Sequence, residues 1–447
     1  MKKRIVIVGG GFGGAAVAGR LEQLFRRDSA VEIILVDREN FSVFTPLLPE
    51  VPSGAVEAKH VVSPLRAQLP RTSVRQTEVH AIDVERRRLV AGHCPKCAEY
   101  VLEYDYLVLG LGAVTNFFGI PGVAARAMTM KGLADAATLH DHVIGQFEHA
   151  DLDPDPAARR RLLTFVVAGG GFAGVETAAE LNDFVREAGR YYPNIRPSDV
   201  RIVVVDAGDR ILPEVSASLS AYALRKLESR GVEVRLRTRI EGCDDERVRI
   251  STGEEITSQT LIWTAGVAPN PLLKDIDVPR EGSGRIAVEP TLAVKGHAEI
   301  FALGDCAASI DRATGRPYPP TAQFAIRQGR VVADNIAAAI RGGRSRPFDF
   351  MPLGLLASLG RRSAVAEVLG FKFSGFFAWL MWRAIYLSKL PGFERKVRVA
   401  LDWALDLVFP RDIVYLRSLH RTGGPAPADE SIEHAARAAR VESPVLR

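Results

Sequence analysis

The sequence predicts an α/β fold in which one βαβ unit occurs twice, because two segments share the same order of strand, glycine-rich loop and helix. Residues 4–8 form an apolar run typical of a buried strand, and residues 9–14 hold five glycines before a helical pattern begins. The arrangement returns at an offset of 160, with an apolar run at 163–168 and a loop at 169–174. Over strand end, loop and helix the copies share eight identities in sixteen positions. The repeat therefore predicts two Rossmann-like domains.

Each loop places glycine at its first, third and sixth positions, the pattern of a dinucleotide-binding turn. The first glycine allows the tight turn, the second lets a pyrophosphate approach the backbone, and the third lets helix and strand pack closely. The pyrophosphate then meets free N–H groups at the positive end of the helix. These glycines are Gly9, Gly11 and Gly14, then Gly169, Gly171 and Gly174. The alternative is two glycine turns that bind no nucleotide.

An acid ends the second strand of each copy. The apolar run 31–36 leads to Asp37, and the run 200–205 leads to Asp206. Such an acid accepts hydrogen bonds from ribose hydroxyl groups. Asp206 would also repel a 2′-phosphate, which favours NADH over NADPH, although Arg210 lies close enough in sequence to leave NADPH open.

Composition and charge exclude several classes of protein. The chain has 447 residues, of which 47% are hydrophobic and 25% charged, as in globular proteins and unlike disordered chains. Four cysteines are too few for a disulfide framework. Residues 1–350 hold 44 basic and 44 acidic side chains, whereas residues 351–421 hold 11 and 5, so the net charge of +5 arises in one late segment. A neutral body of this size excludes nucleic acid as a partner.

Further signals concern the connections and the chain start. Apolar runs at 106–109 and 300–303 read as later strands, and the acidic, proline-containing segment 151–156 is expected to separate the two nucleotide units. The first residues imitate a signal peptide, but glycines interrupt the apolar region. No window of about 18 residues is apolar and uncharged, so no transmembrane helix is expected.

These motifs resemble the two-dinucleotide-fold flavoprotein reductases, and further stretches narrow the resemblance to the type II NADH:quinone oxidoreductases, or alternative NADH dehydrogenases. It covers about residues 4–417. The stretches are Phe44-Thr45-Pro46-Leu47-Leu48, residues 112–122, Gly174-Val175-Glu176, residues 263–267, Gly304-Asp305, Pro320-Thr321-Ala322-Gln323 with Gln328-Gly329, and residues 360–366.

The resemblance implies a glutathione-reductase-like fold with FAD as cofactor and NADH as substrate. NADH would pass two electrons through FAD to a membrane quinone, without proton pumping. The FAD-binding domain would comprise residues 1–118 and 286–345, and the NADH-binding domain residues 119–285. A membrane-facing amphipathic helical segment at 346–421 and a mobile tail at 422–447 would follow.

The same resemblance implies roles for individual residues. FAD would be held by Gly9, Gly11, Phe12, Gly13, Gly14, Asp37, Arg38, Thr45, Gly112, Asp305 and Ala322, and NADH by Gly169, Gly171, Gly174, Asp206 and Gly266. The catalytic residues would be Pro46, Glu176, Gln323 and Gln328, and the quinone would contact Gln323, Arg327 and Lys372. No metal site is expected.

Two of these residues carry alternatives. Glu176 would face the nicotinamide and flavin and handle a hydride or proton, or it would simply complement the positive end of its helix. Arg327 stands where the family usually has a glutamine. Its permanent charge would pair with an acid elsewhere or alter the choice of quinone.

The basic segment after residue 350 predicts contact with a membrane. It holds three of the four tryptophans, Trp379, Trp382 and Trp403, among arginines and lysines, the composition of a segment in the membrane interface. Arg398, Asp402 and Asp406 form one polar stripe on an otherwise apolar helix. We expect a peripheral protein on the cytoplasmic face of the cell membrane, bound to anionic lipid. The alternative is a buried helical layer or a homodimer interface.

Cysteines bear on competing functions. Cys94 and Cys97 form one Cys-x-x-Cys pair, which is a plain hairpin tip, a redox dithiol or half of an intermolecular metal site. Sulfide:quinone oxidoreductases and disulfide reductases need paired redox cysteines at the flavin, and Cys306 is alone in sequence. An NADH-sensing flavoprotein that acts as a binding partner is the alternative from another class.

Overall fold

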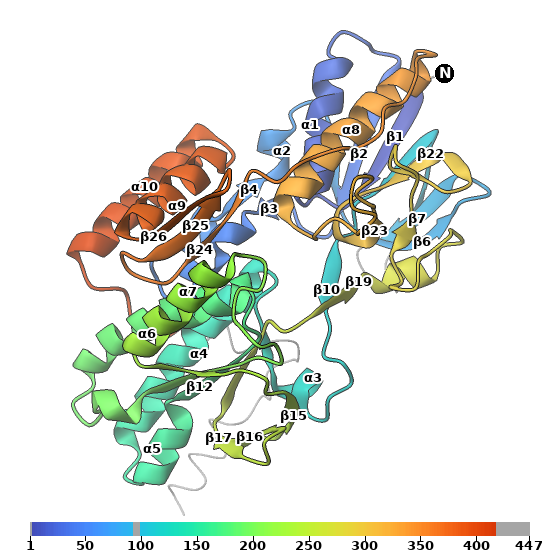
Figure 1. Ribbon diagram of the computed structural model, residues 1–447. Helices are drawn as coiled ribbons and strands as arrows, with labels where there is room; N and C mark the ends of the chain where they lie inside the picture. Colours follow the sequence, from blue (N-terminus) through green and yellow to red (C-terminus); the bar gives the residue numbers. More distant parts are fainter. Residues whose placement is uncertain (1, 93–98, 417–447) are drawn as a thin grey trace, which may run out of the picture.

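The computed structural model describes residues 2–92 and 99–416, and it contains two mainly parallel sheets, one in each half of the molecule (Figure 1). The first sheet has the strand order β21-β22-β9-β1-β2-β5. Its strands are β1 (Lys3–Val8), β2 (Val31–Asp37), β5 (Ser73–Gln76), β9 (Tyr106–Leu109), β21 (Ala293–Val294) and β22 (His297–Ala302). Because β22 pairs in parallel with β9, this sheet is built from two distant parts of the chain.

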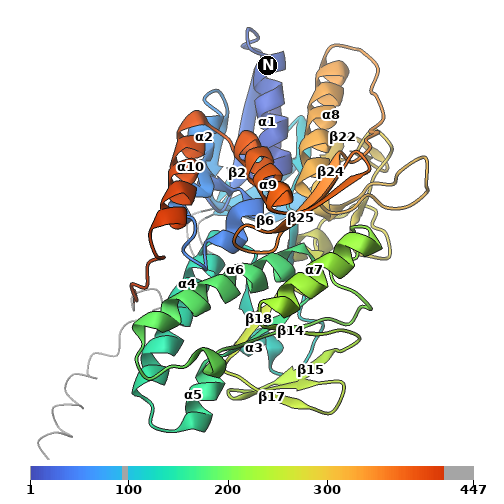
Figure 2. The same ribbon diagram turned by 60° about the vertical axis from the view of Figure 1, so that its left-hand side comes forward.

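Two helices pack side by side on the first sheet. They are α1 (Phe12–Leu24), which follows the first glycine loop, and α8 (Ala322–Ile340), which follows β22 (Figures 1 and 2). Gly329 permits this close packing, since a Cβ there would lie 2.6 Å from the carbonyl oxygen of Gly13.

The second sheet repeats the plan of the first. Its strand order is β11-β18-β12-β13-β14. In this sheet β12 pairs in parallel with β13, just as β1 pairs in parallel with β2 in the first sheet. The strands are β11 (Met128–Thr129), β12 (Thr164–Ala168), β13 (Arg201–Val205), β14 (Val232–Arg235) and β18 (Thr260–Trp263), and the helices are α4 (Leu133–Leu152), α5 (Pro156–Leu162), α6 (Phe172–Ala188) and α7 (Ala217–Ser229). The predicted α/β fold with two Rossmann-like units is therefore confirmed.

The chain crosses between the halves twice, and the two crossings pair with each other. They are β10 (Ala113–Thr115) and β19 (Val267–Pro269), an antiparallel pair that lies between the sheets in Figure 1. The acidic segment 151–156 is not such a crossing, contrary to expectation. Residues 151 and 152 end α4, and Asp155 caps α5 by accepting hydrogen bonds from the N–H groups of Ala157 and Ala158. The segment is a turn between two helices of the second half.

A C-terminal layer, defined as residues 354–408, covers the junction of the two halves (Figure 2). It consists of an antiparallel sheet followed by two helices. The strands are β24 (Gly354–Ser358), β25 (Ala364–Val368) and β26 (Phe371–Gly375), and the helices are α9 (Phe376–Lys389) and α10 (Phe393–Val408). Its inner side packs against α6 and η1 through Trp382, Trp403 and Val399, all buried.

The remaining elements are short. The strands are β3 (Phe41–Val43), β4 (Val62–Pro64), β6 (Glu78–Asp83), β7 (Arg88–Gly92), β8 (Tyr100–Glu103), β15 (Ile240–Cys243), β16 (Arg247–Ile250), β17 (Glu255–Thr257), β20 (Ile286–Ala287) and β23 (Ala307–Ala308). The helices are α2 (Leu65–Gln68), α3 (Val123–Arg126), η1 (Thr45–Glu50), η2 (Ala58–His60), η3 (Gly189–Tyr191), η4 (Pro197–Asp199), η5 (Pro271–Lys274) and η6 (Gly304–Cys306).

Three expectations remain to be placed. Within the described ranges, no helix has the length and apolarity needed to cross a membrane. The Cys94–Cys97 pair and the tail at 422–447 lie outside the described residues. The domain boundaries stay a prediction.

Candidate functional site

Both glycine loops have the backbone geometry of a strand-to-helix turn that only glycine allows. Gly9 and Gly169 begin the loops with positive φ angles of 105° and 110°. A Cβ at Gly14 would lie 1.8 Å from the carbonyl oxygen of Gly9, and one at Gly174 would lie 1.9 Å from that of Gly169. These contacts explain why the first and last glycines of each loop cannot carry a side chain.

The middle of each loop is open, as a bound phosphate requires. A Cβ at Gly11 or Gly171 would meet no atom within 4 Å. The helices that follow, α1 and α6, have no acidic side chain in the first turn and no side-chain cap. Their first N–H groups are thus free to bind an anion, and both loops fit the pyrophosphate of a dinucleotide.

The acid after each second strand is held by the loop itself. Asp37 accepts hydrogen bonds from the N–H groups of Gly10 at 2.5 Å and Glu39 at 2.7 Å. Asp206 does the same with Gly170 at 2.6 Å and Gly208 at 2.7 Å. The carboxylates therefore brace the turns, and each is fixed at the edge of the sheet where a ribose would lie.

Arg210 contacts its own loop. Its Nη2 donates to the carbonyl oxygen of Pro213 at 2.7 Å. Arg210 was the residue that left NADPH open as an alternative to NADH. Its guanidinium is thus bound to the backbone of its own loop.

A tight turn after β22 places Asp305 next to α8. Gly304 has a positive φ of 69°, and its N–H donates to Oε1 of Gln328 at 2.7 Å. Gln328 is buried, so its amide holds the backbone of the turn. This contact indicates a positioning role for Gln328. Ala322 starts the same helix, close in sequence to that turn.

A row of aromatic rings connects the first glycine loop with Glu176. Phe12, at the start of α1, contacts Phe44 with ring centroids 5.9 Å apart, and Phe44 contacts Tyr386 at 6.1 Å. Tyr386 contacts Trp382 at 4.8 Å, and Trp382 Nε1 donates to Glu176 Oε1 at 3.3 Å. Residues far apart in sequence thereby form one wall, beside the Thr45-Pro46 segment of η1.

Glu176 is buried on α6 beneath the C-terminal layer. Besides Trp382, it accepts a hydrogen bond at 2.8 Å from the N–H of Ser358 on β24. Burial, with a smaller contribution from the nearby acids Glu50 and Glu180, raises the pKa of Glu176 to about 8 although the two hydrogen bonds oppose the shift. A carboxyl with this pKa can give or take a proton near neutral pH, which a merely dipole-stabilising glutamate would not do.

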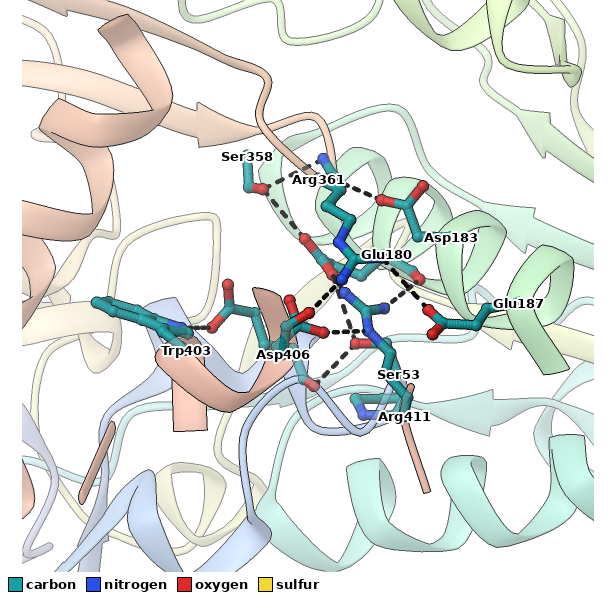
Figure 3. A network of polar contacts seen from close by, with 12 residues as sticks. Ser53, Glu180, Asp183, Glu187, Ser358, Arg361, Trp403, Asp406 and Arg411 are labelled. Atoms are coloured by element: carbon teal, nitrogen blue, oxygen red, sulfur yellow. Dashed lines mark hydrogen bonds and ion pairs between the residues drawn. The ribbon is translucent and has the colours of Figure 1, made fainter. Parts of the chain in front are cut away.

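Glu180 extends the polar contacts away from Glu176 as a buried network (Figure 3). Its Oε2 lies 3.3 Å from Nη2 of Arg411, whose Nε donates to Asp406 Oδ1 at 2.7 Å. Ser358 and Ser53 donate to the two oxygens of Glu180 at 3.3 and 3.4 Å.

Glu50, at the end of η1, joins this network from the other side. Its Oε2 accepts a hydrogen bond from Trp403 Nε1 at 2.7 Å. Burial raises the pKa of Glu50 to about 8, and the carboxyl of Glu180 adds to the effect. Sequence reasoning missed Glu50, Glu180 and Arg411. Two signals in the sequence could have found the glutamates. Glu50 ends the apolar run at 46–50, and Glu180 follows Glu176 by four residues, which places both on one helix face.

The three predicted quinone residues are not brought together at one point. Gln323 Nε2 lies 3.5 Å from the carbonyl oxygen of Gly354, while Lys372 is exposed on the edge strand β26 opposite Glu367. The guanidinium of Arg327 stacks over the ring of Phe350 at 3.9 Å, and no ion pair to it is formed by any residue in the described ranges. The arginine is thus accommodated by an aromatic face.

A cleft of about 590 Å³ opens between α1, α8, β3 and the end of α9. Its apolar lining includes Phe12 and Phe44, so the cleft adjoins the aromatic row. Ile326 and Arg330 line it from α8, and Lys389 lines its outer part at the end of α9. It is large enough for a ring-sized ligand.

The described cysteines do not form a redox pair. Cys243 and Cys306 are both buried and free. Cys306 donates to the carbonyl oxygens of Leu109 and Leu303, and burial raises its pKa to about 11. A thiol of this kind does not supply a thiolate near neutral pH.

The tryptophans of the C-terminal layer are buried, which corrects their expected position in a membrane interface. Trp379, Trp382 and Trp403 are at most 6% exposed. The guanidinium of Arg383 lies between the rings of Trp379 and Trp403, at 4.1 and 4.7 Å. The indole N–H groups of Trp382 and Trp403 donate to Glu176 and Glu50, so these two rings need no headgroups. Exposed phenylalanines and leucines take the outer face instead.

Two of the three residues in the polar stripe of α10 face inward, whereas Arg398 is exposed and pairs with Glu394. Asp402 lies 2.6 Å from His60 Nδ1, and Asp406 is buried against Arg411. The opposite, apolar face of α10 is therefore the exposed one.

Comparison with known proteins decides the family. The model for pyridine nucleotide-disulphide oxidoreductases matches residues 3–329, and that for the NDH2 C-terminal domain matches residues 353–412. The chain is 31% identical to the type II NADH:quinone oxidoreductase NdhA of Mycobacterium tuberculosis, over 97% of this chain and 96% of that protein. It belongs to the type II NADH:quinone oxidoreductases. The resemblance stated from the sequence is confirmed.

Other members and solved structures agree with this family. A probable NADH dehydrogenase of Dictyostelium discoideum is 31% identical over 92% of this chain and 91% of its own length. A structure of NDH2 from Plasmodium falciparum in complex with NADH superposes with a TM-score of 0.87 at 20% identity, covering 93% of this chain and all of that one. The sulfide:quinone oxidoreductase of Aquifex aeolicus shares the fold at a TM-score of 0.68 and 18% identity, covering 91% and 96%.

Proposed function

We propose that this chain is a membrane-associated enzyme that transfers two electrons from NADH through FAD to a membrane quinone, without pumping protons. The observation that carries the proposal is the pair of open glycine loops, one in each half of the molecule. A C-terminal layer of the NDH2 type covers the junction of these two halves. FAD is the cofactor and NADH the electron donor. We retain 1–118 with 286–345 and 119–285 as the domain boundaries.

The first loop is assigned to FAD and the second to NADH. The pyrophosphates would meet the N-termini of α1 and α6, and Asp37 and Asp206 would receive the ribose hydroxyl groups. When bound, FAD supplies the two-electron chemistry, taking a hydride from NADH and passing electrons to quinone. The fixed carboxylate of Asp206 disfavours a 2′-phosphate, so NADH is preferred.

The other assigned residues complete the two sites. Phe12, Gly13, Arg38, Thr45, Pro46, Gly112, Asp305 and Ala322 are assigned to the FAD site, and Gly266 to the NADH site. Gln328 holds the Gly304 turn in place, and Glu176 handles the proton.

The quinone is assigned to the region between the aromatic row and the cleft. Phe12 and Phe44 belong to both, which would let a hydrophobic ring pass from the cleft toward the first loop. Gln323, Arg327 and Lys372 stay as proposed quinone contacts, although none of them lines the cleft.

The exposed face of the C-terminal layer is assigned to the membrane. Phe377 is 75% exposed and Leu405 53%. The other exposed large apolar side chains of β26, α9 and α10 are Phe371, Phe373, Phe376, Leu380, Phe393, Val397, Leu401, Leu407 and Val408, and Phe409 follows directly. An apolar face of this extent marks an interaction surface. Lysines and arginines at residues 372, 389, 395, 396 and 398 flank it and would attract anionic headgroups on the cytoplasmic face.

The test is NADH oxidation with a panel of quinones, with and without vesicles of anionic lipid. We expect quinone-dependent turnover that anionic vesicles increase. Bound flavin that NADH reduces but that no quinone reoxidises would refute the acceptor. Turnover far below the usual range of about 1–1000 per second would favour the sensor alternative.

A paired variant tests the surface separately. Phe377→Asp with Leu405→Asp should abolish vesicle binding, whereas Leu152→Asp, on a leucine of α4 that is 82% exposed, should not. If the double variant instead converts a dimer to a monomer and leaves vesicle binding intact, the face is a homodimer interface.

A further inference from the structure

The buried network around Glu180 holds more acids than cations. Four carboxyls, those of Glu50, Glu176, Glu180 and Asp406, face the two guanidiniums of Arg383 and Arg411. The neighbouring acids Asp183 and Glu187 are matched by Arg230 and Arg361. All six side chains of the central group are buried. Since an unpaired buried charge is costly, two of the four carboxyls must carry protons at neutral pH.

Two serines lie among these carboxyls. Glu176 and Glu180 lie four residues apart on one face of α6. Ser358 contacts both, since it donates its backbone N–H to Glu176 and its hydroxyl to Glu180. The hydroxyl of Ser53 contacts the Glu180 carboxyl and the backbone carbonyl oxygen of Glu50. Both hydroxyl groups can donate or accept, so they can serve Glu180 whether it is protonated or ionised.

The proposed reaction needs one proton that NADH does not bring. Reduction of a quinone to a quinol takes up two electrons and two protons. The hydride of NADH supplies both electrons and one proton, so the second proton must come from solvent. Glu176 is buried, so a proton that it gives away must return through neighbouring groups.

We propose that Glu50 and Glu180 form a buried proton store that keeps Glu176 protonated and returns the proton it gives to the quinone. This inference rests on the proposed function. Glu176 loses a proton to the quinone oxygen, Glu180 passes its proton to Glu176, and Glu180 regains one from solvent. Glu50 and Glu180 act through Glu176 and are positioning residues. The direction agrees with the pKa values of all three glutamates, which burial raises above the ordinary range.

The charged groups around the store all come from elements packed against α6. Arg383 and Tyr386 face it from α9, Asp406 from α10, and Arg411 from the chain that follows. From α4, His140 lies beside Gly54, and its Nδ1 donates to the carbonyl oxygen of Pro52. Removing the Glu180 charge takes away a repulsion that raises the pKa of Glu176, so that pKa should fall.

The test compares Glu180→Gln with Glu187→Gln, a matched change on the same helix at an acid that is paired with Arg361 outside the store. Turnover is followed against pH with a quinone and with ferricyanide, which accepts single electrons and no proton. For Glu180→Gln we expect quinone turnover to fall about tenfold or more above pH 8. Its alkaline limb should move to lower pH, and the solvent deuterium isotope effect should rise. Ferricyanide reduction should change less than about threefold.

Two further variants keep the test decisive. Glu180→Asp, which retains the carboxyl, should recover the wild-type pH profile. If Glu180→Gln does not fold, Glu50→Gln carries the same expectation. Glu180→Gln would overturn the proton store if it lost equal turnover with quinone and with ferricyanide at an unchanged pH profile. A Glu180→Gln variant that behaved like Glu187→Gln would overturn it as well. A wild-type protein that reduces ferricyanide but no quinone would overturn the proposed function instead.

Discussion

Arg411 is the residue whose loss should cost the C-terminal layer most. Its side chain is 2% exposed and contacts Asp406 at 2.7 Å and Glu180 at 3.3 Å. Arg411→Met keeps the apolar stem but removes the nearer cation of two buried acids and leaves them only the more distant Arg383. Breaking a buried pair in this way costs about 3–5 kcal/mol, which is a factor of about 100 to 4000 in the equilibrium for unfolding the layer.

Urea unfolding followed by tryptophan fluorescence measures this cost. Three of the four tryptophans lie in α9 and α10, so the signal reports on the layer. The matched control is Arg398→Met, which removes an exposed pair with Glu394 on α10 and should cost at most about 0.5 kcal/mol. Equal effects of the two variants would refute the reasoning, because burial alone separates them.

The pH dependence gives a second check on Arg411→Met. Burial already raises the pKa of Glu180, and the guanidinium of Arg411 opposes this shift, so without Arg411 the folded-state pKa of Glu180 rises further above its unfolded value. A carboxyl with a raised folded pKa loses stability as pH rises. The deficit relative to the wild type should therefore be larger at high pH than at low pH. A deficit that grows on acidification would contradict this assignment.

Three shorter predictions concern the nucleotide site and Glu176. Gly174→Ala puts a Cβ 1.9 Å from the carbonyl oxygen of Gly169, so NADH binding should be lost in a titration while flavin content, set by the first loop, is kept. Asp206→Asn removes one charge-assisted acceptor worth about 1.5–3 kcal/mol, so kcat/KM for NADH should drop about 10- to 150-fold and that for NADPH should drop less. Wild-type quinone turnover should fall as pH rises through about 8, where Glu176 loses its proton, and Glu176→Gln should lack this alkaline limb. A limb retained in that variant would assign it to another group.

Local patterns in the sequence predicted the nucleotide units well. Strand, loop and helix are adjacent along the chain, and the clashes at Gly14 and Gly174 involve the same loop that the pattern defines. The acids Asp37 and Asp206 follow the strand ends and could be placed for the same reason. What these acids do for the loop backbone was not predictable, because it depends on the exact turn.

The buried network could not be predicted, because its partners are far apart in sequence. Glu180 meets Arg411 across 231 positions, and Glu50 meets Trp403 across 353. Composition also gave a wrong position for the tryptophans. Aromatic residues flanked by cations are typical of a membrane interface, yet Arg383 lies buried between two of the tryptophan rings. Which face of α9 turns inward depends on what α6 and η1 offer to it.

The split first sheet inverts the order in which the two halves can be completed during synthesis. β22 is a strand of the first sheet and α8 packs on that sheet, but both come later in the sequence than every strand of the second sheet. On a ribosome, the sequence of the second unit is therefore complete while the first unit still lacks β22, the second strand from the edge of its sheet, and the helix α8 that covers it. A nascent chain ending before residue 297 would present an unpaired edge at β9, the kind of surface that chaperones recognise. The half that begins the chain is thus the last to close.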